Sequence, residues 1–493
     1  MLSSAPIFSN MFMVFLNRFA PVLLGMTACL LTACQGHQTG RVSLPLTVPE
    51  AFSETGTAVH PRWWISFNDP TLTELVERVL SDNLAMAEAW ARLDQARALA
   101  DLAAANRWPV LNADADAGRS RSNITTGISG SDSEAVYTNR FSLVAAAAYE
   151  VDLWGRLAAL DRAARLDAAA SRQDLYSMAV SLTAETTDTW FSLIERQALL
   201  NLVREQLKTN RTLLELVRYR FANGLAPALD VFQQRQLVAA NETRVPPLES
   251  RLQVLRHRLA VLTGRPPRER MVIVPAELPD LPPLPDTGLP AELLRIRPDL
   301  RAAEARLAAA DERVAAAVAD RFPSLRLQVS GGYRATELEQ VFENLIWDIL
   351  GNLSDTLWDA GRESAEVLRR RAVVQERAAS YARTALIAFQ EVEDALTREA
   401  FQRRYIERLT DQIEAARETF EQSGIRYRQG LTDYLPVLTA LRSLQTLEQT
   451  LITARRELLS HRIALHRALG GIWPGDGIVR NGPFVLNPLE ITP

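Results

Sequence analysis

The sequence predicts a mainly α-helical protein that also contributes four β-strands to a transmembrane β-barrel. The stretch 156–223 contains no proline and no glycine and is rich in Ala, Leu, Arg and Glu. At about 1.5 Å per residue, one helix of this length reaches about 100 Å, which few globular folds use. Small apolar and polar residues alternate in Leu111–Ala117 and Leu325–Gly331, and this period of two predicts strands with two unlike faces.

The composition excludes several classes of protein. The 493 residues include 55 Lys plus Arg and 59 Asp plus Glu, so the net charge is −4 and no overall positive field recruits nucleic acid. Charged residues interrupt the apolar stretches outside the N-terminus, which excludes a helical multispan transporter. The two cysteines, Cys29 and Cys34, lie near the N-terminus, so the body holds no disulfide framework and no cysteine metal site.

The N-terminus predicts an exported, lipid-anchored protein. Arg18 precedes an apolar stretch that is too short for a membrane-spanning helix and ends in small residues. The Leu-Thr-Ala-Cys sequence that ends at Cys34 resembles the lipobox of bacterial lipoproteins. This resemblance implies a signal peptide over 1–33, a lipid on Cys34, and an anchor with an extended segment over 34–70. Gln35 then permits transfer to the outer membrane under the sorting rule that this motif resembles.

Other interpretations of this terminus stay open. The Met-Thr-Ala-Cys sequence ending at Cys29 is a poorer copy of the same motif. Translation could begin at Met11 or Met13, since the first ten residues add nothing that a signal peptide needs. Ordinary cleavage would leave Cys34 as a free thiol.

The body of the chain is a duplication. Arg220 to Leu225 aligns with Arg426 to Leu431, and the same offset of 206 residues joins Gly264 to Gly470. The repeats therefore cover 71–264 and 291–470, with a proline-rich linker over 265–290 and a C-terminal tail over 471–493. Because the period is far longer than a solenoid repeat, a two-copy fusion is predicted.

Each repeat is expected to fold as a helix, two strands and two long helices. Apolar residues recur every three or four positions in 71–107, after the start signal Asp69-Pro70, and predict an amphipathic helix. Gly224 ends the long helix of the first repeat, and Pro227 and Asp230 begin a helix that returns to Gly264. The second repeat has Gly430, Asp433 and Pro436 in the corresponding places, so both pairs form antiparallel coiled-coil hairpins.

The predicted strands are the part of the chain that indicates a membrane protein. The second strand alternates from Phe141 to Val151, whereas the fourth, near Trp347 to Trp358, is predicted mainly from the repeat. On the strand pattern alone, a half-buried soluble sheet is the simpler interpretation. The export signal and the lipid anchor favour instead a sheet with one face toward membrane lipid. Polar segments over 119–136 and 335–345 resemble the outer loops of barrels. Since barrels need about eight strands, several chains must share one barrel.

At this point the sequence resembles the TolC-like outer membrane efflux proteins, in their lipoprotein branch, over nearly the whole mature chain. The family fold implies a homotrimer, a shared twelve-stranded barrel, and a periplasmic tunnel of long and paired short helices with an equatorial girdle. The resemblance rests on four motifs: Trp63-Trp64 with Phe67-Asn68-Asp69-Pro70, Tyr149 to Arg156, Leu293 to Leu307, and Leu357 to Arg362.

The resemblance also implies a gate near the two glycine breaks, Gly224 and Gly430. Asp230 stands where such proteins place an acidic gate residue, and Tyr427 matches its aromatic partner across the repeat. Thr439 and Pro436 stand where relatives commonly have acidic residues. The alternative for Asp230 and Asp433 is simple helix capping. Further gate candidates are Arg426, Asp433 and Arg442.

No enzyme motif is present, and no cofactor is expected beyond the lipid on Cys34. Of the five His, His461 and His466 lie five apart on a helix and face different ways, so no metal site is predicted. The leading hypothesis is a passive outer-membrane channel for small molecules, joined to a periplasmic adaptor and an inner-membrane pump. A duct for secreted polypeptides and a non-porous, lipid-anchored coiled coil are the alternatives.

Overall fold

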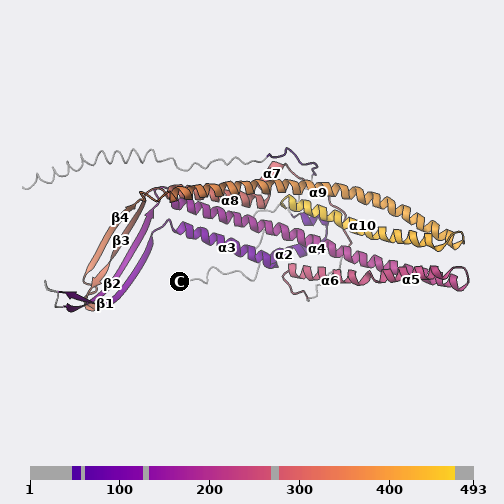
Figure 1. The fold of residues 1–493 in the computed structure, drawn as a ribbon, viewed down its shortest axis with the longest axis horizontal. Coiled ribbons are helices and arrows are strands. Elements are labelled where there is room, and N and C mark those ends of the chain that lie inside the picture. Colours follow the sequence, from indigo (N-terminus) through magenta and orange to yellow (C-terminus); the bar gives the residue numbers. More distant parts are fainter. Residues whose placement is uncertain (1–46, 57–61, 126–132, 268–276, 472–493) are drawn as a thin grey trace, which may run out of the picture. The chain divides into compact units, whose positions relative to one another are not determined.

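The computed structural model describes residues 47–56, 62–125, 133–267 and 277–471 (Figure 1). The chain forms two compact units. Of the described residues, unit 1 contains 96–168 and 305–379, and unit 2 contains the rest. Cys29, Cys34, the predicted signal peptide and residues 472–493 of the predicted tail lie outside the described residues.

Helices make up most of the chain, as predicted. The helices α4 (Arg156–Ala222) and α9 (Arg362–Arg428) have 67 residues each, which confirms the long helix predicted from 156–223. No helix in the described ranges has the uninterrupted apolar length that crossing a bilayer requires. The remaining helices are η1 (Trp63–Phe67), α2 (Pro70–Asp82), α3 (Leu84–Ala105), α5 (Ala228–Glu242), α6 (Val245–Leu262), α7 (Pro290–Ile296), α8 (Pro298–Ala319), η2 (Leu338–Gln340) and α10 (Tyr434–Ala468).

The single helix predicted over 71–107 is wrong, because the chain breaks at Asn83 between α2 and α3. The Asn83 backbone is extended, and its side-chain Oδ1 accepts hydrogen bonds from the amides of Ala85 over 2.8 Å and Met86 over 3.4 Å. Its Nδ2 donates to the Leu262 carbonyl over 2.8 Å. Asparagine thus caps α3 and holds it to α6, a role for which its short amide is well suited.

The return helix of the first repeat is also two helices rather than one. The break comes at Thr243-Arg244, and Pro246 and Pro247 follow in the first turn of α6. Proline lacks an amide hydrogen, and its ring clashes with the preceding turn, so these residues start a helix and do not continue one. The second repeat has no such prolines, and α10 is continuous.

Unit 2 has an aromatic core around η1. The side chains of Trp63, Trp64 and Phe67 are buried against Trp190 and Phe191 of α4. Asp69 caps α2 by accepting the amides of Thr71 and Leu72, which confirms the predicted start signal. Its second oxygen accepts from the Trp190 indole over 2.6 Å, so one carboxylate both begins α2 and ties it to α4.

A buried arginine holds the linker to the second repeat. The Arg462 guanidinium, fully buried, donates to both oxygens of Glu399 over 2.8 and 2.7 Å. It also donates to the carbonyls of Pro282 and Pro283. The planar fork of arginine can satisfy a carboxylate and two carbonyls at once, which a lysine ammonium cannot do with the same geometry. The linker is therefore fixed to α9 and α10.

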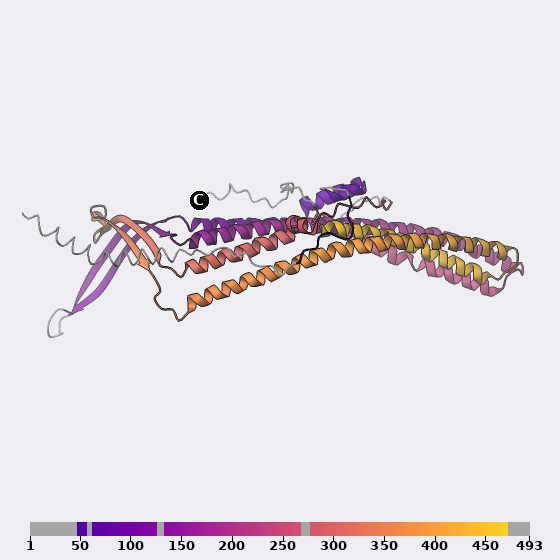
Figure 2. The ribbon, with the colours of Figure 1, turned by 90° about the horizontal axis from the view of Figure 1, so that it is seen from above.

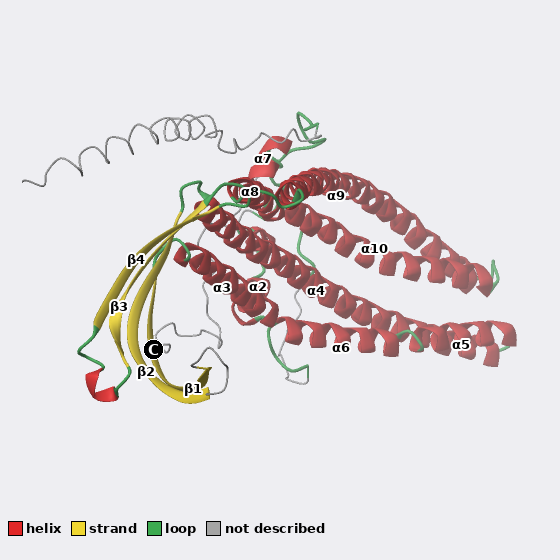
Figure 3. Ribbon diagram, turned by 60° about the vertical axis from the view of Figure 1, so that its left-hand side comes forward, coloured by secondary structure: helices red, strands yellow, loops and turns green. Residues whose placement is uncertain are grey.

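Unit 1 contains one antiparallel sheet in the order β1-β2-β3-β4 (Figure 3). The first two strands run further than predicted, so 119–125 and 133–136 of the segment predicted as a loop over 119–136 belong to strands. The loop predicted over 335–345 is confirmed between its end positions, where it contains η2. The polar residues of 119–125 and 133–136 continue these two strands beyond their apolar part. The fourth strand ends before Trp358. The bounds are β1 (Val110–Thr125), β2 (Ser133–Val151), β3 (Ser324–Ala335) and β4 (Leu345–Ser354).

The strand register gives the sheet two unlike faces. Directly paired residues lie on the same face of an antiparallel sheet. Ala113 pairs with Ala145, Ala145 with Gly331, and Gly331 with Trp347. On the face that contains this row, the residues from Leu111 to Ala117 on β1 are apolar, and so are the residues paired with these rows across the sheet. We call these apolar rows the apolar band. The opposite face contains Asn112, Asp114, Asp116, Arg140, Ser142, Glu150, Arg326, Gln328, Ser330, Asp348 and Asn352.

Candidate functional site at the two helix turns

Two glycine turns form one end of unit 2, which we call the tip. There α4 with α5 and α9 with α10 make two hairpins that lie side by side in both views (Figure 1, Figure 2). Gly224 and Gly430 have φ values of +71° and +73°, a backbone region that favours glycine. The amide of Leu225 donates to the Arg220 carbonyl, and that of Leu431 to the Arg426 carbonyl, so the turns have the same construction.

Asp230 lies in the first turn of α5, and its side chain does not cap the helix. The N-cap position belongs to Pro227, which makes no side-chain bond. The Asp230 side chain points instead to α9, where the Tyr427 hydroxyl donates to its Oδ2 over 3.4 Å. Both residues are only 6% exposed. The structure therefore brings together the predicted acidic residue and its predicted aromatic partner.

The pKa of Asp230 is raised above its ordinary value of 3.8, chiefly because burial disfavours its charge. The hydrogen bond from Tyr427 and the positive charge of Arg220 act in the opposite direction, whereas the negative charge of Asp433 adds to the rise. Burial also raises the pKa of Tyr427, so its hydroxyl stays protonated and able to donate.

Arg220 is a member of this site that the sequence reasoning missed. Its guanidinium carbon lies 4.6 Å from the centre of the Tyr427 ring. A cation over an aromatic face is attracted to the electron-rich ring, and Arg220 also supplies positive charge near Asp230. The duplication could have identified Arg220 as a gate candidate, because Arg220 is the counterpart of Arg426, which was predicted as one in the second repeat.

The other predicted candidates lie outside this contact. Arg426, Asp433 and Arg442 are exposed. Asp433 occupies the N-cap position of α10, yet its side chain makes no capping bond there. Arg442 lies close enough to Tyr434 for its charge to lower the pKa of that phenol, although burial dominates and the net pKa shift is upward.

A buried amide network continues from the tip between the hairpins. The Tyr434 hydroxyl donates to Gln234 Oε1 over 2.7 Å, and Gln234 Nε2 donates to the Asn210 carbonyl over 2.8 Å. Asn210 and Gln445 exchange side-chain hydrogen bonds of 3.2 and 3.0 Å, and Asn241 donates to Gln445 over 3.4 Å. These amides are at most 4% exposed, and their bonds join α4 and α5 to α10. We call this group the amide network.

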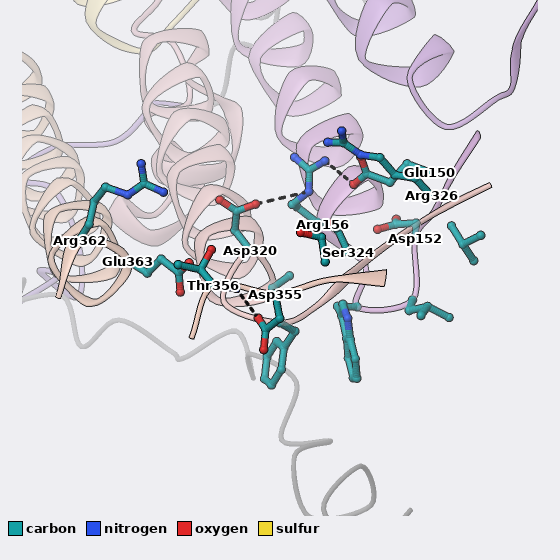
Figure 4. Close-up of a pocket in the computed structure, with 16 residues that line it drawn as sticks. Glu150, Asp152, Arg156, Asp320, Ser324, Arg326, Asp355, Thr356, Arg362 and Glu363 are labelled. Atoms are coloured by element: carbon teal, nitrogen blue, oxygen red, sulfur yellow. Dashed lines mark hydrogen bonds and ion pairs between the residues drawn. The ribbon is translucent and has the colours of Figure 1, made fainter. Parts of the chain in front are cut away.

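A second polar site lies in unit 1, where strands meet helices. Figure 4 shows Arg156 between Glu150 and Asp320, at 2.5 and 3.6 Å from their oxygens. Arg326 lies 3.7 Å from the other Glu150 oxygen, and the pocket has a volume of about 290 Å³. Glu150 and Asp320 thus pair with arginines, and Asp152 accepts backbone amides at the start of α4. Among the described residues, no three His, Cys, Asp or Glu side chains gather as a metal site would require.

Comparison with known proteins places this architecture in a family. The family model described as "Outer membrane efflux protein" matches residues 75–265 and 289–471. The pyoverdine export outer membrane protein OpmQ of Pseudomonas aeruginosa is 32% identical over 463 residues, which cover 92% of this chain and 97% of that protein. The toluene efflux pump outer membrane protein TtgF of Pseudomonas putida is 30% identical, over 83% and 85% of the two chains.

Solved structures agree with this result. The outer-membrane channel OprN superposes with a TM-score of 0.81 at 32% identity, covering 88% of this chain and 98% of its own. The outer membrane protein VceC of Vibrio cholerae superposes with a TM-score of 0.76 at 26% identity, covering 84% of this chain and 100% of its own. With the long helices, the four-stranded sheet and the repeated glycine turns, these matches show that the chain belongs to the outer membrane efflux protein family.

Proposed function

We propose that this protein is the outer-membrane channel of a tripartite efflux system, through which small molecules pass passively. The observation that supports this proposal most is the structure of the sheet. One face holds the apolar band, and the opposite face holds most of the polar and charged side chains of the same rows, as strands between lipid and a water-filled lumen require. Four strands cannot close on themselves, and an open edge cannot face lipid. Three copies would complete a twelve-stranded barrel.

The cargo is proposed to be a small organic molecule. OpmQ is named for pyoverdine export and TtgF for toluene efflux, and both share most of their length with this chain. A duct for polypeptides remains the alternative within the same architecture. Pore blocking separates the small-molecule channel from the polypeptide duct. A folded peptide that binds and occludes the channel at low concentration would favour the polypeptide duct.

The tip is proposed to hold the channel closed and to meet the periplasmic adaptor. The contact between Asp230 and Tyr427 joins α5 to α9, so separating the hairpins must break it. Leucines are exposed at equivalent places of both turns, namely Leu225 with Leu431 and Leu229 with Leu435, at 57–64%. Exposed apolar side chains repeated by the duplication suit a partner that contacts both hairpins.

The protein is also proposed to be anchored in the outer membrane by lipid on Cys34 and to extend into the periplasm. The sequence around Cys34 supports this, and the mature N-terminus tests it. Intact mass spectrometry should find a lipid-modified Cys34, and Cys34→Ser should lose the added mass. A mature chain that begins elsewhere with an unmodified N-terminus would contradict the anchor.

One preparation tests the channel itself. Purified protein should have the mass of a trimer in native mass spectrometry and should produce discrete conductance steps in planar bilayers. A monomer without conductance would favour the non-porous coiled coil.

A further inference from the structure

Two arginines lie on the same face of the sheet as the apolar band, just beyond it. In the strand register, Ala117 pairs with Phe141, and these close the band on β1 and β2. The next row on the same face is Arg119 with Asn139, and the row after that is Arg121 with Tyr137. The alternation that places Ala113, Ala115 and Ala117 on the apolar band therefore places both arginines on the same face.

These arginines are exposed, and their charges are not neutralised by the rest of the described chain. Their guanidinium carbons lie 5.1 and 5.8 Å from the centre of the Tyr137 ring. No carboxylate of the described residues lies within ion-pair distance of either one. Tyr137 is itself 57% exposed, so the three side chains form an open surface. We call them the arginine–tyrosine cluster.

The cluster lies at the end of the sheet that is distant from the helices. The chain enters β1 from α3 at Val110 and leaves β2 into α4 after Val151, so those ends belong to the helical side. Arg119 and Arg121 lie nine and eleven residues further along β1 from Val110. In an outer-membrane channel whose helices enter the periplasm, this end of the sheet is at the outer leaflet.

We propose that the arginine–tyrosine cluster binds the phosphates of lipid A, the glycolipid of the outer leaflet, and so fixes the depth of the barrel in the membrane. Guanidinium groups pair with phosphate through two parallel hydrogen bonds, and tyrosine favours the boundary between apolar and wet layers. The apolar band would hold the acyl chains directly below. This inference rests on the proposed outer-membrane location.

The test is lipid A binding to the purified full-length protein, titrated in detergent and counted by native mass spectrometry. Removing both charges in Arg119→Gln/Arg121→Gln should weaken binding by about fivefold per arginine. Arg119→Lys/Arg121→Lys keeps the charges and should retain most of the affinity. Arg140→Gln is the matched control, because Arg140 pairs with Gly118 on the opposite face of the same two strands.

Four results would overturn the proposal. The double glutamine variant could bind lipid A like wild type, or Arg140→Gln could lose as much affinity as that variant. Phosphatidylglycerol could bind as tightly as lipid A, which would remove the assignment to the outer-leaflet glycolipid. Trimers of the double variant could dissociate without any change in lipid binding, which would assign the arginines to the acidic segment 337–343 of a neighbouring copy.

Conductance of the same preparation separates this inference from the proposed function. A protein that conducts but shows no arginine-dependent binding of lipid A would overturn the inference alone. A protein that binds lipid A through these arginines but never conducts would overturn the channel and leave the lipid contact standing.

Discussion

Asp230 is a carboxylate enclosed by the tip of its own chain. Burial disfavours its charge, and neither the hydroxyl of Tyr427 nor the charge of Arg220 fully offsets this. The carboxylate therefore holds protons more tightly in the closed tip than it would in water. If opening exposes it to solvent, proton binding and closure are linked.

This linkage predicts that acid favours the closed tip. The stabilisation of the closed tip by proton binding to Asp230 is complete below pH 3.8, the ordinary pKa of Asp. It is lost as the pH rises through the raised pKa of Asp230. In planar bilayers, the open probability of the wild-type channel should fall as pH is lowered from neutral toward that value. Asp230→Ala should remove this part of the pH dependence. Identical pH profiles for the two proteins would show that Asp230 does not couple to opening.

At the scale of the element, the amide network fixes how α10 lies against α4 and α5. Apolar side chains could pack between these helices in several registers, whereas paired amides are satisfied in one only. Gln445 is central, since it bonds both Asn210 and Asn241. The hairpins are therefore held in register by these buried polar groups.

Replacing Gln445 with leucine should destabilise the protein. The change orphans the buried amides of Asn210 and Asn241, at about 1–3 kcal/mol for each unsatisfied group. Denaturant unfolding followed by circular dichroism measures the loss. Gln422→Leu, on an exposed position of α9, is the control and should stay within about 0.5 kcal/mol of wild type. Equal stability of the two variants would show that the network does not hold the hairpins.

The helices and strands follow closely from the sequence, because long propensity and alternation signals are hard to override. The breaks at Asn83 and at Thr243-Arg244 were missed, although Asn83 and Pro246 each give a local reason to interrupt a helix. Apolar periodicity continues across both positions and conceals them. At the tip, the pairing of Asp230 with Tyr427 was expected from family resemblance. Arg220 was missed although the duplication makes it the counterpart of Arg426, because three-dimensional packing decides which of the two arginines lies against Tyr427.

At the scale of the whole molecule, the sheet has two free edges. In the order β1-β2-β3-β4, the outer strands each have one hydrogen-bonded neighbour in the described chain. The unpaired backbone groups of such an edge are costly in lipid, so another copy must pair with them. Each β1 should thus lie beside β4 of the next copy.

Engineered cysteines test this pairing, since Cys29 and Cys34 are the only native cysteines. Ala115→Cys on β1 should form disulfides with a cysteine at position 347, 349 or 351 of β4, because all lie on the apolar band. Non-reducing gels should show covalent dimers and trimers for at least one pair, and none for the single variants. Monomers throughout the series would contradict a shared barrel.

The central claim is that the chain forms a channel whose tip contact keeps it shut. Tyr427→Phe tests this most directly, because it removes the hydroxyl bonded to Asp230 and leaves the ring beneath Arg220. Tyr405→Phe, on an exposed part of the same helix, is the matched control. Single-channel recording in planar bilayers should show a higher open probability for Tyr427→Phe than for wild type or Tyr405→Phe. Equal open probability in all three proteins, or no conductance in any, would contradict the claim.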